Sequence, residues 1–290
     1  MIVELGRLRG ERPGATVILV GGIHGNEPAG VEACRRLLAR VDARAIAGEL
    51  VAFAGNPAAL AAGRRYLARD MNRQWTPALL AAARAIEDAE SAALLALADA
   101  IDDLLAGARG PVFALDLHTT SAEGIPFAIA GGAAADRAFA REVPLPVIIG
   151  LQESLGGTLT EYLAARGCVA LAVEGGQNDS PAAAAHLEAV IAVGLAAAGV
   201  VELAEVEQAR AILQRARGHL PPTIEVMLRH PVGAGFRMEP GFANIERVAS
   251  GTLLARDDAG EIRAPFDGLL LMPLYQAQGS DGFFLGREVA

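Results

Sequence analysis

The sequence is poor in cysteine, and it contains neither a run of basic residues nor a long apolar segment. Two cysteines, Cys34 and Cys168, among 290 residues cannot form a disulfide framework and favour a reducing compartment. A net charge of −9 without any basic run argues against nucleic acid and anionic membrane surfaces as partners. Polar residues interrupt every stretch that approaches the roughly 18 apolar residues of a membrane-spanning helix.

Residues 1–20 also lack the features of an export signal. Charged residues such as Glu4, Arg7 and Arg12 interrupt this segment, and it has neither a basic start nor a small-residue cleavage site. We therefore expect a cytoplasmic protein.

The alternation of apolar runs and breaks predicts an α/β fold in two parts. Hydrophobic residues make up 52% of the chain, and many of them are alanines, which favour helices. From Pro221 onward, short strands expected at 223–228, 235–238, 251–255 and 261–272, with frequent glycine and proline, predict a small all-β module. We expect a catalytic domain over residues 1–205 and a β domain over residues 215–290. Strands are expected at 1–8, 15–20, 48–55, 111–120, 125–130, 146–150 and 169–173, and helices at 29–40, 77–106, 158–166 and 181–215.

The turn at residues 21–27 carries His24 and Glu27 at the carboxyl end of a predicted buried strand. Sites collect at such strand ends in open α/β sheets, and a histidine and a glutamate three residues apart can reach one ion. The plainer alternative is a polar turn in which Asn26 caps the following helix and His24 is exposed.

Other predicted strand ends also carry functional groups. They are a polar cluster at 64–73, His118 in Asp116-Leu117-His118, and Glu174. With His24 and Glu27, the side chains of His118 and Glu174 make up a hydrolytic zinc site of two histidines and a glutamate with a carboxylate base beside it. Taken singly, His118 could be a core histidine bonded to a backbone carbonyl, and Glu174 a capping or ion-paired carboxylate.

These motifs, in this order, resemble the succinylglutamate desuccinylase/aspartoacylase family, a branch of the zinc carboxypeptidase-like hydrolases. The resemblance rests on residues 21–27, Asn56-Pro57, Arg65-Tyr66, 70–73, 116–118 and 173–177. It covers the whole chain and implies a mixed sheet flanked by helices, with a small C-terminal all-β domain over the active-site cleft.

The resemblance also implies roles for individual residues. One Zn²⁺ per chain would be held by His24, Glu27 and His118, with Glu174 as the general base. Arg65 would stabilise the oxyanion, and Asn72 and Arg73 would bind a substrate carboxylate. Asp70 would orient the first metal histidine, and Asp116 would act in a similar way.

Two further features bear on the substrate. The resemblance suggests that the C-terminal module contributes Tyr275 to the pocket, although a packed tyrosine in a β module is the plain alternative. Aspartoacylase has an extra arginine before the catalytic glutamate, whereas this chain has Thr160, Glu161 and Tyr162 there and no arginine until Arg166. This departure argues against N-acetylaspartate, and Glu161 could favour a substrate that carries an amine.

The function expected from the sequence is zinc-dependent hydrolysis of an N-acyl amino acid or a related small amide. The alternatives are a metallocarboxypeptidase that acts on short peptides, and a binding protein that keeps the fold without the chemistry. A symmetric dimer is the base-rate expectation for the assembly.

Overall fold

A computed structural model describes residues 3–201 and 204–289 of the chain. Eleven strands form one mixed sheet, and three form a small second sheet. The strands are β1 (Val3–Arg9), β2 (Arg12–Gly21), β3 (Ala47–Ala54), β4 (Val112–Thr120), β5 (Phe127–Ala130), β6 (Val147–Ile149), β7 (Val169–Gln177), β8 (Thr223–Pro231), β9 (Arg237–Met238), β10 (Glu246–Val248), β11 (Leu253–Asp257), β12 (Gly260–Arg263), β13 (Gly268–Leu271) and β14 (Asp281–Glu288). The large sheet has the order β1-β3-β2-β4-β7-β5-β6-β8-β14-β13-β10, and the small sheet has the order β12-β11-β9.

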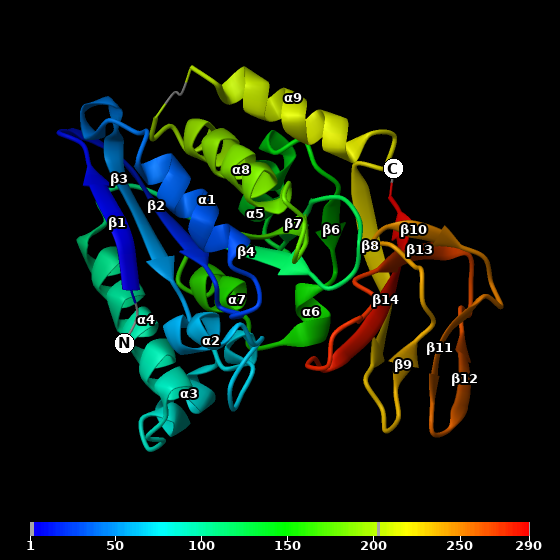
Figure 1. The fold of residues 1–290 in the computed structure, drawn as a ribbon. Coiled ribbons are helices and arrows are strands. Elements are labelled where there is room, and N and C mark those ends of the chain that lie inside the picture. The colour runs from blue at the N-terminus through cyan, green and yellow to red at the C-terminus, as the bar shows by residue number, and fades with distance from the viewer. Residues whose placement is uncertain (1–2, 202–203, 290) are drawn as a thin grey trace.

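Helices cover both faces of the half of the large sheet that begins at β1. They are α1 (Ala29–Leu38), α2 (Pro57–Ala62), α3 (Pro77–Ala83), α4 (Ala89–Gly107), α5 (Ala134–Glu142), α6 (Gln152–Leu155), α7 (Leu159–Ala164), α8 (Ala183–Ala197) and α9 (Val206–Arg217), with short 3-10 helices at Ala43–Ala45 and Met71–Arg73. In Figure 1, α1, α8 and α9 lie on one side of the sheet, and α3, α4 and α7 lie on the other. Within the described residues, every helix is too short or too polar to cross a membrane.

The central strands are buried on both faces, which explains their continuous apolar runs. In β2, Val17 and Leu19 pack in the core under α1 and α8, whereas Ile18 and Val20 pack in the core that includes α4 and α7. Strands β3, β2, β4 and β7 run parallel, so their carboxyl ends lie along one edge of the sheet.

The C-terminal strands continue this sheet instead of standing apart from it. Strand β8 pairs parallel with β6, and β14 then pairs antiparallel with β8. A shared apolar cluster joins Phe127 and Ile148 of the first part to Leu269 and Phe284 of the last. The division into domains at residues 205 and 215 stays a prediction.

The structure confirms the mixed α/β sheet flanked by helices and corrects the extents of several elements. The helix expected at 77–106 is two helices, α3 and α4, because Asp88 caps a new helix by accepting a hydrogen bond from the Ser91 N–H. The helix expected at 181–215 is also two, because α8 stops before Gly199, whose positive φ of 68° ends it. Strands β10 and β14 were missed. The expected opening strand begins at Met1, and residues 1–2 lie outside the described part of the chain.

Candidate metal centre

His24 and Glu27 lie in the loop between β2 and α1, and His118 lies near the end of the neighbouring strand β4. This loop runs close to α2, since a side chain at Gly25 would collide with the backbone of Ala59. Asn26 does not cap α1: its side-chain amide donates to Gln276 Oε1 at 2.8 Å, and no side chain caps that helix. The alternative of a capped polar turn is therefore wrong.

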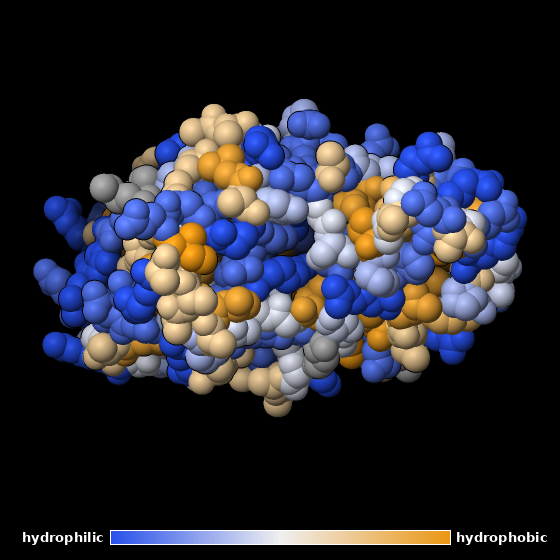
Figure 2. All heavy atoms as spheres, turned by 90° about the horizontal axis from the view of Figure 1, so that it is seen from below, coloured by the Kyte–Doolittle hydropathy of each residue, from blue (hydrophilic) through white to orange (hydrophobic). Residues whose placement is uncertain are grey.

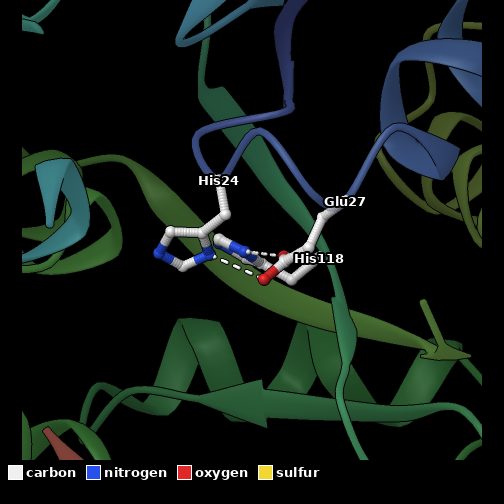
Figure 3. A group of neighbouring side chains, drawn as sticks. All are labelled: His24, Glu27 and His118. Carbon is white, nitrogen blue, oxygen red and sulfur yellow. Dashed lines mark hydrogen bonds and ion pairs between the residues drawn. The ribbon is translucent and has the colours of Figure 1, made fainter. Parts of the chain in front are cut away.

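Ligand atoms of His24, Glu27 and His118 all lie within 4.8 Å of one another, and the three side chains are buried. The Nδ1 atoms of His24 and His118 are each 2.9 Å from Glu27, the former from Oε1 and the latter from Oε2 (Figure 3). Figure 3 shows the two imidazoles and the carboxylate turned toward one another.

The outward nitrogen of each imidazole is held by an aspartate. His24 Nε2 is 3.1 Å from Asp70 Oδ1, and His118 Nε2 is 2.9 Å from Asp116 Oδ2. Such a carboxylate fixes the ring orientation and keeps the proton on Nε2, which leaves Nδ1 free to bind an ion. His118 is therefore no ordinary core histidine bonded to a backbone carbonyl.

The charges in this cluster are strongly coupled. Burial alone would raise the pKa of Glu27, but the neighbouring His24 and the hydrogen bond to His118 lower it far below its usual value. Burial would lower the pKa of His118, yet Asp116 and Glu27 hold it well above its usual value. The cluster thus keeps a carboxylate charged in the interior by supplying positive charge around it.

These residues fit a divalent cation of the zinc type. Two imidazole nitrogens and a carboxylate are the donor set of catalytic zinc sites that keep one position open. His24 Nδ1 is buried and lacks hydrogen-bond geometry to any partner within the described chain, although Glu27 lies close to it. A cation bound between His24 Nδ1 and the Glu27 carboxylate would give this buried nitrogen the partner that it lacks.

Arg65 lies beside the cluster and joins two of its acids. Its guanidinium donates to Glu27 Oε1 at 3.0 Å and to Asp70 Oδ2 at 3.4 Å. The backbone carbonyl of Arg65 also accepts from the Gly25 N–H, which fixes the loop at 64–69 against the loop that carries His24 and Glu27.

Asn72 and Arg73 follow Asp70 closely in the chain and differ in how many of their polar side-chain atoms already have partners within the protein. The Asn72 side-chain oxygen Oδ1 accepts from the Leu159 N–H at 2.9 Å, and its amide nitrogen Nδ2 donates to Asp116 Oδ2 at 3.4 Å. Asn72 thus spends its polar atoms within the protein. Arg73 donates to Asp281 Oδ2 at 2.9 Å, and its buried Nε has no hydrogen-bond partner in the described chain.

Glu174 lies on β7 directly opposite His118 on β4, in the register of the two parallel strands. Burial, opposed by the charge on His118 and aided by that on Glu27, raises the pKa of Glu174 to about 7. Its buried Oε2 has no hydrogen-bond partner among the described residues, so Glu174 is not a capping or ion-paired carboxylate there. A carboxylate with such a pKa can gain and lose a proton near neutral pH.

Of the residues expected in the site, all but Asp70, Asp116 and Tyr275 line one cavity of about 880 Å³, part of it open to solvent. Figure 2, which shows one face of the molecule, has a hollow near its middle with mainly hydrophilic atoms around it. The lining of the cavity combines apolar side chains with a few polar groups, which is typical of small-molecule sites.

Tyr275 does not line this cavity, contrary to expectation. Its hydroxyl donates to the Glu239 carbonyl at 2.7 Å and accepts from the Phe242 N–H at 3.0 Å, so it holds a surface loop. The next residue, Gln276, lines the cavity instead. Glu161 does not line it either, because its carboxylate completes a capping box with Thr158 at the start of α7.

Sequence reasoning missed Glu90, which positions the loop that carries Arg65 and Asp70. Its carboxylate is 4% exposed and accepts from the N–H groups of Leu67, Ala68 and Arg69 at 2.6, 2.7 and 2.9 Å. The prediction of a single helix over 77–106 placed Glu90 in the middle of that helix. The capping residue Asp88 would have indicated that Glu90 lies in the first turn of a separate helix.

A family model offers an independent comparison. The model of the succinylglutamate desuccinylase/aspartoacylase catalytic domain matches residues 13–215. The chain belongs to this family. The match includes the metal cluster, Asp70, Asp116, Arg65 and Glu174, and it ends before β8.

Curated desuccinylases align with only part of the chain. Succinylglutamate desuccinylase from Serratia proteamaculans (strain 568) is 46% identical over 61 residues, which make up 20% of this chain and 19% of that protein. The one from Burkholderia pseudomallei (strain 1710b) is 38% identical over 109 residues, 36% of this chain and 30% of that protein. The aligned segments thus span less than a third of either relative.

Solved structures of the family share the fold over nearly the whole chain. A succinylglutamate desuccinylase/aspartoacylase from Rhodobacter sphaeroides has a TM-score of 0.71 at 21% identity, covering 98% of this chain and 88% of that one. The product-bound ectoine utilization protein EutE (DoeB) from Ruegeria pomeroyi has a TM-score of 0.70 at 22% identity, covering 96% and 87%.

The contact between Asp70 and His24 predicts that Asp70→Asn weakens Zn²⁺ binding. Asparagine can still cap residues 71–73, but it lacks the charge that makes the imidazole a better ligand. We expect the Kd for Zn²⁺ to rise by about 10–100-fold, measured by competition with a chromophoric chelator. Asp99→Asn is the matched control, because the Asp99 side chain is 65% exposed. An unchanged Kd in Asp70→Asn would contradict the role of Asp70.

The buried carboxylate of Glu90 predicts that Glu90→Gln destabilises the fold. The amide cannot accept hydrogen bonds at both ends, so at least one of the three N–H groups at 67–69 loses its partner. We expect the free energy of unfolding to fall by about 1–3 kcal/mol, measured by urea denaturation. Glu87→Gln, on an exposed residue nearby, should leave the urea midpoint unchanged. Equal midpoints for all three proteins would refute this account of Glu90.

Proposed function

We propose that the protein is a zinc-dependent deacylase that hydrolyses the amide bond of an N-acyl amino acid. The observation that carries this proposal is the convergence of His24, Glu27 and His118, with Glu174 opposite His118 on the adjacent strand. Membership of the succinylglutamate desuccinylase/aspartoacylase family supports it. A cytoplasmic location and a symmetric dimer stay predictions.

Each inner residue has a defined task in this proposal. His24 and His118 offer Nδ1 and Glu27 offers its carboxylate, while Asp70 and Asp116 orient the two rings. Zn²⁺ bound there would act as a Lewis acid that lowers the pKa of its water to near 7.

Glu174 is the proposed base. Its carboxylate accepts a proton from the attacking water and returns it to the leaving amine. A pKa raised by burial suits both steps, because a group that takes and then gives a proton works best near the ambient pH. Arg65 would stabilise the oxyanion that forms on the amide carbonyl.

Arg73 is the proposed site for the substrate carboxylate. It lines the cavity, where its guanidinium can donate hydrogen bonds to a carboxylate. Asn72, also expected to bind substrate, is better placed to hold α7 and Asp116 in position.

Replacement of the base gives the direct test. Glu174→Gln should still bind one Zn²⁺ per chain, because Glu174 is not among the proposed ligands. Loss of the base should cut kcat/KM for an N-acetyl amino acid by about 10²–10⁴-fold. Zinc content by atomic absorption and hydrolysis by amine release check the two parts. A variant with intact zinc and undiminished turnover would remove Glu174 from the mechanism.

The titration of Glu174 also predicts a pH dependence. The base must be deprotonated, so kcat/KM should fall as pH is lowered through its pKa and level off above it. That pKa is about 7 without metal, and a bound cation lowers it by adding positive charge beside the carboxylate. Assays from about pH 5 to about pH 8 should therefore show an acid limb below pH 7, with zinc occupancy verified at each pH. A rate that rises toward low pH would contradict this assignment.

A further inference from the structure

Four apolar side chains form one wall of the cavity. Ile129 on β5, Leu151 before α6, Leu155 at the end of α6 and Phe284 on β14 line it. These four side chains belong to one apolar cluster, in which Ile129, Leu151 and Phe284 are at most 6% exposed. The wall is thus part of the packed core and is set in position before any ligand arrives.

A register shift in β14 puts Phe284 on the same side of the sheet as Asp281, the partner of Arg73. The pairing of β14 with β8 shifts register between Asp281 and Phe283. Without the shift, residues 281 and 284 would face opposite sides of the sheet, but both line the cavity here. Asp281 binds Arg73, so Phe284 lies on the same side of the site as the proposed carboxylate clamp.

Arg229 ties α6 to the same place. It donates to Asp281 Oδ1 at 2.6 Å and to the Ser154 carbonyl at 2.7 Å. These contacts link Arg73 through Asp281 and Arg229 to α6, and Leu155 at the end of that helix lines the same cavity as Arg73. A substrate whose carboxylate binds Arg73 therefore meets the apolar wall with its adjoining side chain.

Positive charge is scarce in the cavity. Among the described lining residues, the only arginines are Arg65 and Arg73, and there is no lysine. Arg65 is already bound to Glu27 and Asp70, and Arg73 is bound to Asp281. Beyond the single place at Arg73, a second substrate carboxylate finds no free cation on this wall.

Three polar residues that line the cavity close to α6 and α7 in the chain are neutral and bonded to one another. Gln152 Nε2 donates to Thr160 Oγ1 at 2.8 Å, and Thr158 Oγ1 is 3.1 Å from the same atom. The Gln152 amide nitrogen and the two hydroxyls thus already have partners within the protein, and none of these groups carries a positive charge for a second carboxylate.

We infer that the cavity selects N-acyl amino acids with one carboxylate and an apolar side chain, in preference to N-acyl glutamate or aspartate. This inference rests on the proposed deacylase function and assigns specificity to Ile129, Leu151, Leu155 and Phe284. Each methylene buried against them raises affinity roughly fourfold. A second carboxylate placed there would be buried without a partner.

Methionine and glutamate side chains test the inference, because they are similar in length and differ in charge. With zinc-loaded protein, kcat/KM for N-acetylmethionine should exceed that for N-acetylglutamate by at least about 100-fold. The free product amino acids should follow the same order in calorimetric titrations, with methionine bound at least about 10-fold more tightly. Equal or better hydrolysis or binding of the glutamate compound would overturn the inference.

The two measurements separate this inference from the proposed function. If zinc-loaded protein hydrolyses N-acyl amino acids but prefers the acidic ones, the deacylase function stands and the selectivity falls. If it hydrolyses none of them, the proposed function falls. The binding titration then still decides the pocket's preference, and the absence of any methionine binding would also overturn it.

Leu155→Arg tests the apolar wall itself. A cation at this position should receive the glutamate carboxylate, so the kcat/KM ratio of N-acetylglutamate to N-acetylmethionine should rise by at least about 10-fold. Leu79→Arg is the matched control, because Leu79 is 38% exposed on α3 and does not line the cavity. Thermal melting of both variants verifies folding, and titration of the free amino acids gives a second readout. A folded Leu155→Arg protein with an unchanged ratio and unchanged binding would refute the assignment.

Discussion

The rest of the site depends on the buried carboxylate of Glu27, which lies between two imidazoles. An unpaired charge in the interior is costly, and Glu27 is 2% exposed. Its two oxygens therefore each face a histidine Nδ1, one from its own loop and one from β4. This arrangement requires β2 and β4 to keep their parallel register, because a slip of one residue would turn His118 to the other face.

Successive layers of charge surround that carboxylate. Asp70 and Asp116 bind the outer edges of the two imidazoles, and Arg65 joins Glu27 to Asp70. Glu90 accepts hydrogen bonds from three backbone N–H groups at 67–69 and so holds the loop that carries Arg65 and Asp70. Contacts to charged side chains hold the loop at 64–69, which forms neither a helix nor a strand.

The residues at strand ends could be predicted from sequence because they follow apolar runs directly, and parallel strands end at one edge. Asp281 and Glu90 could not, because each acts on residues far away in the chain and no local pattern marks that contact. Alanine favours a helix in any window, so the alanine-rich segments concealed the break before Asp88. For Tyr275, the resemblance pointed to the right segment, but the neighbouring Gln276 is the residue that lines the cavity.

The site is built from residues inside the span that the family model matches and from residues beyond it. All proposed ligands and the base lie within residues 13–215, the span that the family model matches. Asp281 and Phe284, which complete the cavity, lie beyond it on a strand that joins the main sheet through β8. Family membership therefore supports the proposed attack on an amide bond, whereas the inferred selectivity depends on a wall that the last strand partly builds. Members of the family that differ in this strand would then differ in the substrate side chain they select and would still cleave the same kind of bond.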